Sequence, residues 1–457
     1  MDEQSLLEQV ASITARYRER RDQSPVFPRI AAQELRRAFG VGTPMPPEGS
    51  PEGEVIADLV RCAEPGIVAS TGPRYFGFVI GGSLPVATAA DWLTSAWDQN
   101  SGIYAASPAA SVVEEAAAGW LLELLGLPAG ASVGFVTGCG MANFTALAAA
   151  RHHVLRREGW DVELDGLNGA PPINVVVGDE VHVTVLTALR MLGLGTRAIK
   201  RVPTDEQGRM IAAGLERILE TCTGPTIICA QAGNVNTGAF DPLEPISEAA
   251  RRKGAWLHVD GAFGLWAATS EETRHLVAGA ERADSWATDA HKWLNVPYDC
   301  GLVMCSHPEA HRAAMTVSAA YLVQSDQVRD PLDWTPEFSR RARGFTVYAA
   351  LKHLGRRGVC EMVERCCGCA RQMADLLRVH PAVEILNDVV LNQVLVRFHK
   401  SDDSTRAVIE RVQQDGTCWL AGTTWHNMAA MRISVSNWST TRNDIAVSAA
   451  AILRAID

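Results

Sequence analysis

From about residue 130, short apolar runs rich in β-branched residues alternate with stretches of helical periodicity. The runs are VGFVT (133–137), INVVVGD (173–179), TIICAQAG (226–233), AWLHVD (255–260), SWATD (285–289) and GLVMC (301–305). This alternation predicts βα units whose strands form a largely parallel sheet. The gap between SWATD and GLVMC is too short for a helical crossover, so we expect GLVMC to run antiparallel to its neighbour.

The rest of the chain divides into smaller parts. Residues 1–23 have a charged amphipathic pattern, and a loop rich in Pro and Gly follows at 45–54. A helix rich in Glu and Ala is expected after AWLHVD. Beyond residue 345, helices at 346–379 precede strands near VEIL, VLVRF and MRISVS, and a final helix. We therefore predict an N-terminal helical segment (1–85), a large domain (86–345) and a small α+β domain (346–457).

Composition excludes several classes of protein. The 457 residues are 47% hydrophobic and 21% charged, as in an ordinary folded soluble protein. A net charge of −10 argues against a general binder of nucleic acid or anionic membranes. The sequence contains neither an export signal nor an apolar run of about 18 residues. We therefore expect a cytoplasmic protein that has no membrane or nucleic-acid partner.

The eleven cysteines are expected to be free thiols, because we expect a protein that stays in a reducing compartment. The cluster Cys366, Cys367 and Cys369 invites a metal-binding interpretation. However, Cys366 shares its helical spacing with apolar residues, and paired Cys-x-x-Cys motifs are absent. We predict a core position for Cys366 and no metal site.

Residues able to do chemistry follow five of the predicted strands. They are Gly138–Gly140 after VGFVT, His182 after INVVVGDEV, Asn234 after IICAQAG, Asp260 at the end of AWLHVD, and His291 with Lys292 after SWATD. In open parallel sheets, ligands bind beyond the carboxyl ends of the strands. We therefore expect these residues to surround one site.

Lys292 stands among Trp, Leu, Val and Pro residues in the motif SWATDAHKWLNVPYDCG. Burying an ammonium group without a partner is costly. One interpretation is a lysine whose stem is buried while its charge reaches water. The other is a nucleophile, because an amine in an apolar setting loses its proton more easily and can form a Schiff base with an aldehyde.

The stretch TGCGMAN (137–143) is either a plain strand–helix turn or a site where backbone N–H groups bind a phosphate. Asp260 is either a cap or buried ion-pair partner, or a carboxylate that keeps a heterocyclic nitrogen protonated. Ala262 is small enough for a flat ring to lie against it, and His182 is either a core histidine or a ring-stacking one. A nucleophilic lysine, a phosphate-binding turn and a strand-end aspartate together indicate a pyridoxal 5′-phosphate site.

At these residues the chain resembles the group II pyridoxal-phosphate-dependent amino acid decarboxylases, which include aromatic-L-amino-acid and glutamate decarboxylases. The similar motifs are PRYFGFVIGG (73–82), AASPAASVVE (105–114), TGCGMANFTALAAAR (137–151), NVNTGAFDP (234–242), HVDGAFG (258–264) and DAHKWLNVPYDCG (289–301). The resemblance covers roughly residues 60–440. It implies the fold-type I, aspartate aminotransferase-like architecture: a mostly parallel seven-stranded sheet, a small C-terminal domain, and an N-terminal segment that packs on the partner in a homodimer.

The resemblance also implies roles for the residues at the strand ends. Lys292 would form the Schiff base with pyridoxal phosphate, His291 would contact the phosphate, and Asp260 would pair with the pyridinium nitrogen. Ala262 and His182 would enclose the ring, and His182 would also lie near the substrate carboxylate.

Other positions also match the family. Gly138, Cys139 and Gly140 would form the phosphate loop, and Asn234 would make a polar contact with the cofactor. Tyr321 stands about thirty residues past the lysine, where the aromatic enzymes carry a tyrosine that protonates the carbanionic intermediate. Relatives with Phe at that position tend to form aldehydes by oxidative chemistry.

Two regions depart from the family. Asp289 stands where the aromatic enzymes usually have Asn, and a carboxylate near a phosphate is unfavourable unless it points away or is paired. The region expected to contact the substrate lacks several bulky aromatic positions. Val79, Ile80 and Asn100 are predicted to line the substrate pocket, and the identity of the amino acid stays open.

We therefore predict decarboxylation of an L-amino acid to the amine and CO₂. A nearer alternative keeps the cofactor but catalyses oxidative deamination to an aldehyde, or transamination. A nicotinamide-dependent oxidoreductase is a distant alternative, because only the TGCGMAN turn suggests it and it leaves Lys292 and Asp260 without a role.

Overall fold

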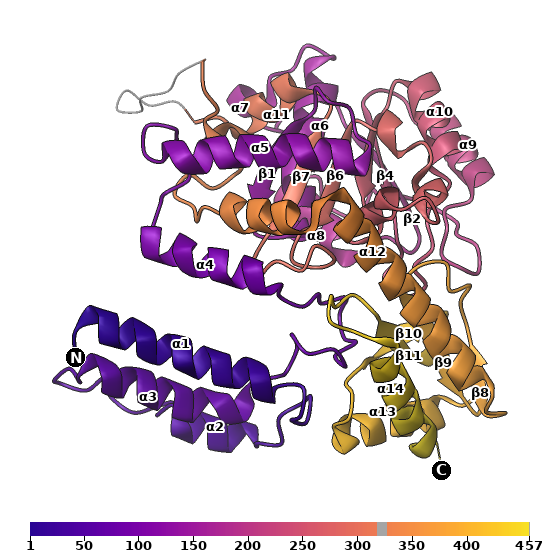
Figure 1. The fold of residues 1–457 in the computed structure, drawn as a ribbon. Helices are drawn as coiled ribbons and strands as arrows, with labels where there is room; N and C mark the ends of the chain where they lie inside the picture. The colour runs from indigo at the N-terminus through magenta and orange to yellow at the C-terminus, as the bar shows by residue number, and fades with distance from the viewer. Residues whose placement is uncertain (318–326, 457) are drawn as a thin grey trace.

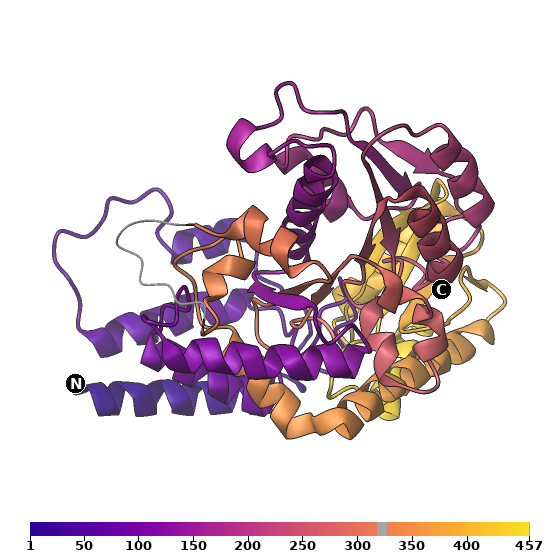
Figure 2. The ribbon, with the colours of Figure 1, turned by 90° about the horizontal axis from the view of Figure 1, so that it is seen from above.

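The computed structural model describes residues 1–317 and 327–456. Figures 1 and 2 show a group of N-terminal helices beside a large domain and a smaller C-terminal domain, each of the two domains built on its own sheet. Helices α1 (Glu3–Arg20), α2 (Ala32–Ala38) and α3 (Glu52–Ala63) lie side by side and project from the body of the molecule (Figure 1). Within the described residues, no helix is both long and apolar enough to cross a membrane.

The large sheet has seven strands in the order β1-β7-β6-β5-β4-β2-β3. Their bounds are β1 (Ser132–Val136), β2 (Asn174–Gly178), β3 (Lys200–Val202), β4 (Thr226–Gln231), β5 (Trp256–Asp260), β6 (Ser285–Asp289) and β7 (Gly301–Cys305). Strands β2 to β6 are parallel to one another, whereas β7 is antiparallel to both β1 and β6. The prediction that GLVMC runs antiparallel to its neighbour is therefore confirmed. Strand β3 was missed because only three residues pair at this edge of the sheet.

Helices cover both faces of this sheet. Val175 and Val177 of β2 pack in a cluster with α6 and α8, whereas Val176 between them packs in the main core with α9 and α10. Burial on both faces explains why these strands are continuously apolar rather than alternating. The helices of the large domain are α4 (Pro85–Trp97), α5 (Pro108–Leu125), α6 (Cys139–Arg156), α7 (Val162–Asp165), α8 (Val183–Met191), α9 (Ala212–Glu220), α10 (Leu243–Lys253) and α11 (Pro308–Met315).

The prediction of a helix after AWLHVD is wrong. Residues 264–282 instead form three short 3₁₀ turns. The hydroxyl of Thr273 donates to the Ala267 carbonyl at 2.8 Å, and the Ser270 hydroxyl accepts from the Glu272 N–H at 3.1 Å. Such local bonds compete with helical ones, so they shorten the helical turns despite the favourable Glu and Ala content.

The C-terminal part begins with α12 (Gly344–Arg378), which connects the two domains and is interrupted at Gly355 (φ 59°, ψ 178°). It continues through β8 (Val383–Ile385), β9 (Gln393–Phe398), α13 (Asp402–Asp415), β10 (Ala421–Trp425), β11 (Met428–Ser434) and α14 (Arg442–Arg454). Strand β10 was not predicted; it pairs only with β11, at the edge of the order β10-β11-β9-β8. Cys366 is buried in the core as predicted, and every cysteine is a free thiol.

Candidate active site at the carboxyl edge of the sheet

The predicted residues meet where β1, β5 and β6 end. Asp260 and Asp289 are the last residues of β5 and β6, and Cys139 is the first residue of α6 after β1. A Cβ on Gly301 would lie 2.4 Å from the Gly138 backbone, so only glycine lets the β1–α6 turn come this close to β7. The segment 78–82 closes the other side, because a Cβ on Gly81 would lie 1.7 Å from the Lys292 backbone oxygen.

Lys292 forms an ion pair with the carboxylate that the sequence left unexplained. Its Nζ lies 3.1 Å from Oδ2 of Asp289, whose side chain is only 3% exposed. Burial lowers the pKa of Lys292, but the nearby charges of Asp289, Cys139 and Asp260 more than offset it, so that the pKa is raised above its ordinary value. The apolar setting acts as the sequence suggested, but in the cofactor-free protein the ion pair with Asp289 acts in the opposite direction.

Asp289 also caps the N-terminus of α6. Its Oδ1 accepts the Cys139 backbone N–H at 2.6 Å and lies 3.5 Å from Nε2 of His291. This carboxylate therefore takes one of the amide groups expected to bind the phosphate. The sequence led us to expect that a carboxylate at position 289 would need a partner. Asp289 has two, the Lys292 amine and the Cys139 N–H group.

His291 has a fixed orientation and proton position. Its Nδ1 accepts the Cys300 N–H at 3.1 Å, so in the neutral ring the proton is on Nε2, the atom directed at Asp289. The ring stacks on Tyr298 with centroids 4.3 Å apart. Burial is the largest influence on His291 and lowers its pKa. A neutral His291 thus presents an N–H donor beside the α6 N-terminus.

Asp260 is buried and receives three donors. Oδ2 accepts the Asn143 side-chain N–H at 3.1 Å, while Oδ1 lies 3.2 Å from the Ala262 N–H and 3.4 Å from the Cys139 thiol. Ala262 is only partly buried and packs beside Cys139 and Ala142 at the start of α6. The arrangement places a buried carboxylate two residues from a small, partly exposed side chain.

His182 is the N-cap residue of α8, and its Nδ1 lies 2.8 Å from the Thr184 hydroxyl and 3.4 Å from the Thr184 N–H. Because the Thr184 N–H can only donate, Nδ1 is an acceptor and the proton of the neutral ring is on Nε2. Burial lowers the pKa of His182, as do the charges of Lys292 and Arg432, although Asp260 acts in the opposite direction. His182 is therefore a neutral N–H donor near two cations.

Arg432 on β11 is a site residue that sequence reasoning missed. Its side chain is buried, burial lowers its pKa, and its Nε has no acceptor among the described residues. Its charge is close enough to lower the pKa of His182. A buried guanidinium group without a partner is costly unless a ligand completes it. The signal in the sequence was a single arginine inside the apolar run of MRISVS.

The predicted substrate residues are placed differently. The Val79 side chain is fully buried in the core, Ile80 is half-buried against Tyr75 and Trp419, and Phe78 beside them is 55% exposed. Phe78 and Val79 both have positive φ angles (54° and 58°), which are strained for residues other than glycine. Phe78 is therefore the exposed side chain of this segment, and its ring lies 5.4 Å from the Trp419 ring, centroid to centroid.

Two other predicted residues stabilise local structure. Asn100 is exposed, and its Oδ1 accepts the Arg340 N–H at 3.2 Å. The Asn234 Oδ1 accepts the N–H groups of Asn236 and Thr237, which fixes the turn after β4. Contacts of Asn100 with substrate and of Asn234 with cofactor stay predictions. Tyr321 lies outside the described residues.

The residues fit pyridoxal phosphate. Lys292 supplies an amine, Asp260 a carboxylate for the ring nitrogen, and Ala262 a small surface for the ring. The α6 N-terminal N–H groups other than that of Cys139, together with the His291 Nε2–H that lies 3.5 Å from Asp289, would supply donors for a phosphate. These groups lie on the sheet edge that the strand-end argument predicted.

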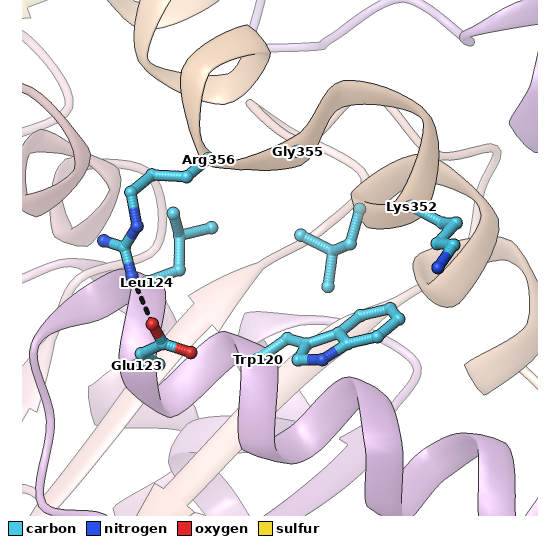
Figure 3. A pocket seen from close by; sticks show the side chains of 7 residues that line it. Trp120, Glu123, Leu124, Lys352, Gly355 and Arg356 are labelled. Carbon is cyan, nitrogen blue, oxygen red and sulfur yellow. Dashed lines mark hydrogen bonds and ion pairs between the residues drawn. The ribbon is translucent and has the colours of Figure 1, made fainter.

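A separate hollow lies between α5 and the break in α12 and has a volume of about 270 Å³. Figure 3 shows Arg356 paired with Glu123 at 2.8 Å, and Lys352 beside the Trp120 ring, 5.8 Å from its centroid. The charged groups of this hollow therefore have partners within the chain. None of its lining residues is a predicted site residue, and we assign no function to it.

The free energy of unfolding should depend on pH because of His258, a fully buried histidine on β5. Burial lowers the pKa of His258 to about 4, below the ordinary value of 6.5. The contribution of neutral His258 to stability is therefore complete above pH 6.5 and is lost as pH falls toward 4, by up to about 3 kcal/mol. Urea unfolding of wild type and His258→Gln at pH 7.5 and 4.5 should show a smaller decrease for the variant. An equal decrease in both proteins would contradict this assignment.

Comparison with known proteins agrees with the geometry. Residues 35–399 match the model of the pyridoxal-dependent decarboxylase conserved domain. The chain is 27% identical to tryptophan decarboxylase 1 of Oryza sativa subsp. japonica, covering 95% of this chain and 90% of that protein. It is 31% identical to the acidic amino acid decarboxylase GADL1 of Mus musculus over 70% of this chain and 59% of the mouse protein.

The fold is also that of a solved relative. The Oryza sativa TDC determined with PLP and tryptamine superposes with a TM-score of 0.92 at 24% identity, covering 99% of this chain and 97% of the other. The family model covers most of the chain and includes every described residue of the cluster except Arg432. The chain belongs to the pyridoxal-dependent decarboxylase family and is a pyridoxal-phosphate-dependent amino acid decarboxylase.

Proposed function

We propose that Lys292 binds the cofactor covalently and that this site removes the carboxylate of an L-amino acid as CO₂, releasing the amine. The observation that carries the assignment is the largely buried Lys292, in the turn after β6, near Asp260 at the end of β5 and the N-terminus of α6. When bound, pyridoxal phosphate accepts the electrons that the departing CO₂ leaves behind. Asp260 keeps the ring nitrogen charged, which favours this acceptance.

The other residues orient the substrate and move protons. The His182 Nε2–H and the Arg432 guanidinium supply donors for the substrate carboxylate, since His182 lies near both Lys292 and Arg432 and the Arg432 Nε is unpaired among the described residues. Phe78, held exposed by its strained backbone, meets the substrate side chain. Tyr321 donates the proton that replaces CO₂ on the α-carbon, as its position in the sequence suggests.

Assaying a panel of L-amino acids tests the function and narrows the substrate. The panel includes aromatic and acidic amino acids, because relatives named for each class match this chain. The holoenzyme should release CO₂ and amine in equal amounts from at least one of them. Aldehyde with ammonia and peroxide would instead support the oxidative alternative, and a keto acid formed with a 2-oxoacid acceptor would support transamination.

Replacing Arg432 should weaken substrate binding more than cofactor binding. Loss of one partner from a buried charged hydrogen bond costs about 2–5 kcal/mol, so Arg432→Gln should raise KM by ~30-fold or more. Arg397→Gln is the matched control, because Arg397 lies on the neighbouring β9 and already pairs with Asp402 at 3.0 Å. An unchanged KM in Arg432→Gln would remove Arg432 from substrate binding.

We also propose that the protein is a homodimer through its N-terminal helices. In α1 and α2 no residue is buried, and Leu7, Phe39, Val55 and Leu59 of the N-terminal helices and the adjoining loop are each 48–60% exposed. Exposed apolar surface of this kind is typical of an interface. Light scattering should give about twice the chain mass of 49.3 kDa.

The free thiols support a second proposal, that the protein works in the reducing cytoplasm.

A further inference from the structure

A buried row of polar groups lies behind Asp260. Trp256 Nε1 donates to the Ser285 hydroxyl at 2.9 Å, and that hydroxyl lies 3.0 Å from Nδ1 of His258. His258 Nε2 lies 2.9 Å from the Asn143 Oδ1, and the Asn143 Nδ2 donates to Asp260 Oδ2 at 3.1 Å. The row therefore ends on the carboxylate that faces the cofactor.

The strand geometry explains why these groups align. Trp256, His258 and Asp260 alternate along β5 and so point to the same face of the sheet. Ser285 pairs directly with His258 across the parallel β5–β6 ladder, and Asn143 comes from α6, which covers that face. The four residues behind Asp260 are each at most 2% exposed, so they cannot touch a substrate.

The carboxylate at the end of the row fixes the positions of the protons. Asp260 can only accept, so Asn143 turns its amide N–H to Oδ2 of Asp260 and its Oδ1 to His258 Nε2. His258 then carries its proton on Nε2 and donates to Asn143 Oδ1. The Nδ1 of the neutral ring is therefore an acceptor for the Ser285 hydroxyl, which in turn accepts the Trp256 indole N–H.

Asn143 also links this row to the opposite side of the cofactor space. The same Nδ2 lies 3.2 Å from the Thr184 hydroxyl, which is 2.8 Å from Nδ1 of His182. Since Thr184 accepts from Asn143, its own proton is free for His182. One buried amide group thus helps to set the orientation of both Asp260 and His182.

We infer that His258 and Asn143 are positioning residues that hold Asp260 as an oriented, hydrogen-bonded carboxylate and, through Thr184, fix the Nε2–H form of His182. Burial supports this assignment because it keeps His258 neutral, with a pKa of about 4. This inference rests on the proposed role of Asp260 toward the cofactor. It goes beyond that role by assigning a task to two residues that touch neither cofactor nor substrate.

Nitrogen NMR of the cofactor-free wild-type protein tests the proton order directly. Long-range ¹⁵N–¹H correlations should show His258 as the Nε2–H form across pH 6 to 8, and Ser285→Ala should weaken that preference. The Nδ1–H form in wild type would overturn the inference. This measurement needs neither turnover nor a folded His258 variant.

Cofactor titration and kinetics test the consequence. His258→Phe keeps a ring but removes both hydrogen bonds, and should lower pyridoxal phosphate affinity and kcat by ~10-fold or more, the scale seen when a group supporting a ligand-binding residue is lost. His258→Gln, whose amide can both donate and accept, should restore much of each. Equal affinity and kcat in His258→Phe and wild type would overturn the inference.

His311→Phe is the matched control for a merely structural effect. His311 is also fully buried beside a serine hydroxyl (Ser132 Oγ, 2.8 Å), but it lies on α11 and its other ring nitrogen contacts the Trp334 carbonyl. The His311→Phe variant should be destabilised as His258→Phe is, but it should keep the cofactor affinity of the wild type. If the affinity changes occur as expected but no amino acid releases CO₂, the proposed function fails while the positioning role stands.

Discussion

Replacing Lys292 by alanine should abolish decarboxylation and, in the same protein, the absorbance band of the lysine-bound cofactor. Removing a covalent catalytic group lowers kcat by about 10⁴-fold or more, because no other group can take over the bond it makes. Both losses should appear together, since one amine is responsible for both. A variant with full turnover would exclude Lys292 as the anchor.

The Lys292→Arg variant distinguishes the loss of the cofactor bond from the loss of folding stability. Alanine leaves the buried Asp289 without its cation, and breaking a buried ion pair costs about 3–5 kcal/mol. Arginine restores a positive charge beside Asp289 but cannot form the cofactor bond. We expect both variants to be inactive, with the cofactor-free alanine variant unfolding at lower urea concentration than the arginine variant.

The second large effect is expected at Asp260. Asp260→Asn keeps the shape of the side chain but removes the charge that balances the ring nitrogen, and it can place an N–H group against the Asn143 donor. Losing a buried charge partner costs about 3–5 kcal/mol, which corresponds to a decrease in kcat of ~10²–10⁴-fold. The absorbance band of the bound cofactor should persist, unlike that of Lys292→Ala.

Asp284→Asn is a matched control for Asp260→Asn. Asp284 lies one residue before β6, at the opposite edge of the sheet, where it pairs with His307 at 2.7 Å. Its replacement should change stability without changing kcat. If Asp260→Asn keeps wild-type kcat, the carboxylate does not act on the cofactor and the assignment of the ring position is wrong.

The sheet could be predicted because its strands are buried on both faces and therefore read as continuous apolar runs. Strands β3 and β10 escaped prediction for the opposite reason, since both are partly exposed edge strands and so have a weak apolar pattern. The helix expected after β5 failed because hydrogen bonds of Ser270 and Thr273 compete with helical ones. These errors lie away from the strand ends, so they left the predicted site intact.

The sequence by itself determined the largely parallel sheet, the edge where the candidate site lies and the lysine proposed to act there. These features depend on local periodicity and on residues close together in one motif. Only the tertiary structure decided the surroundings: the α6 N–H group that Asp289 accepts, the unpaired Arg432, and the row from Trp256 to Asn143 behind Asp260. Hydrogen bonds and burial depend on atoms that meet across separate elements, and no spacing along the chain specifies which atoms these are.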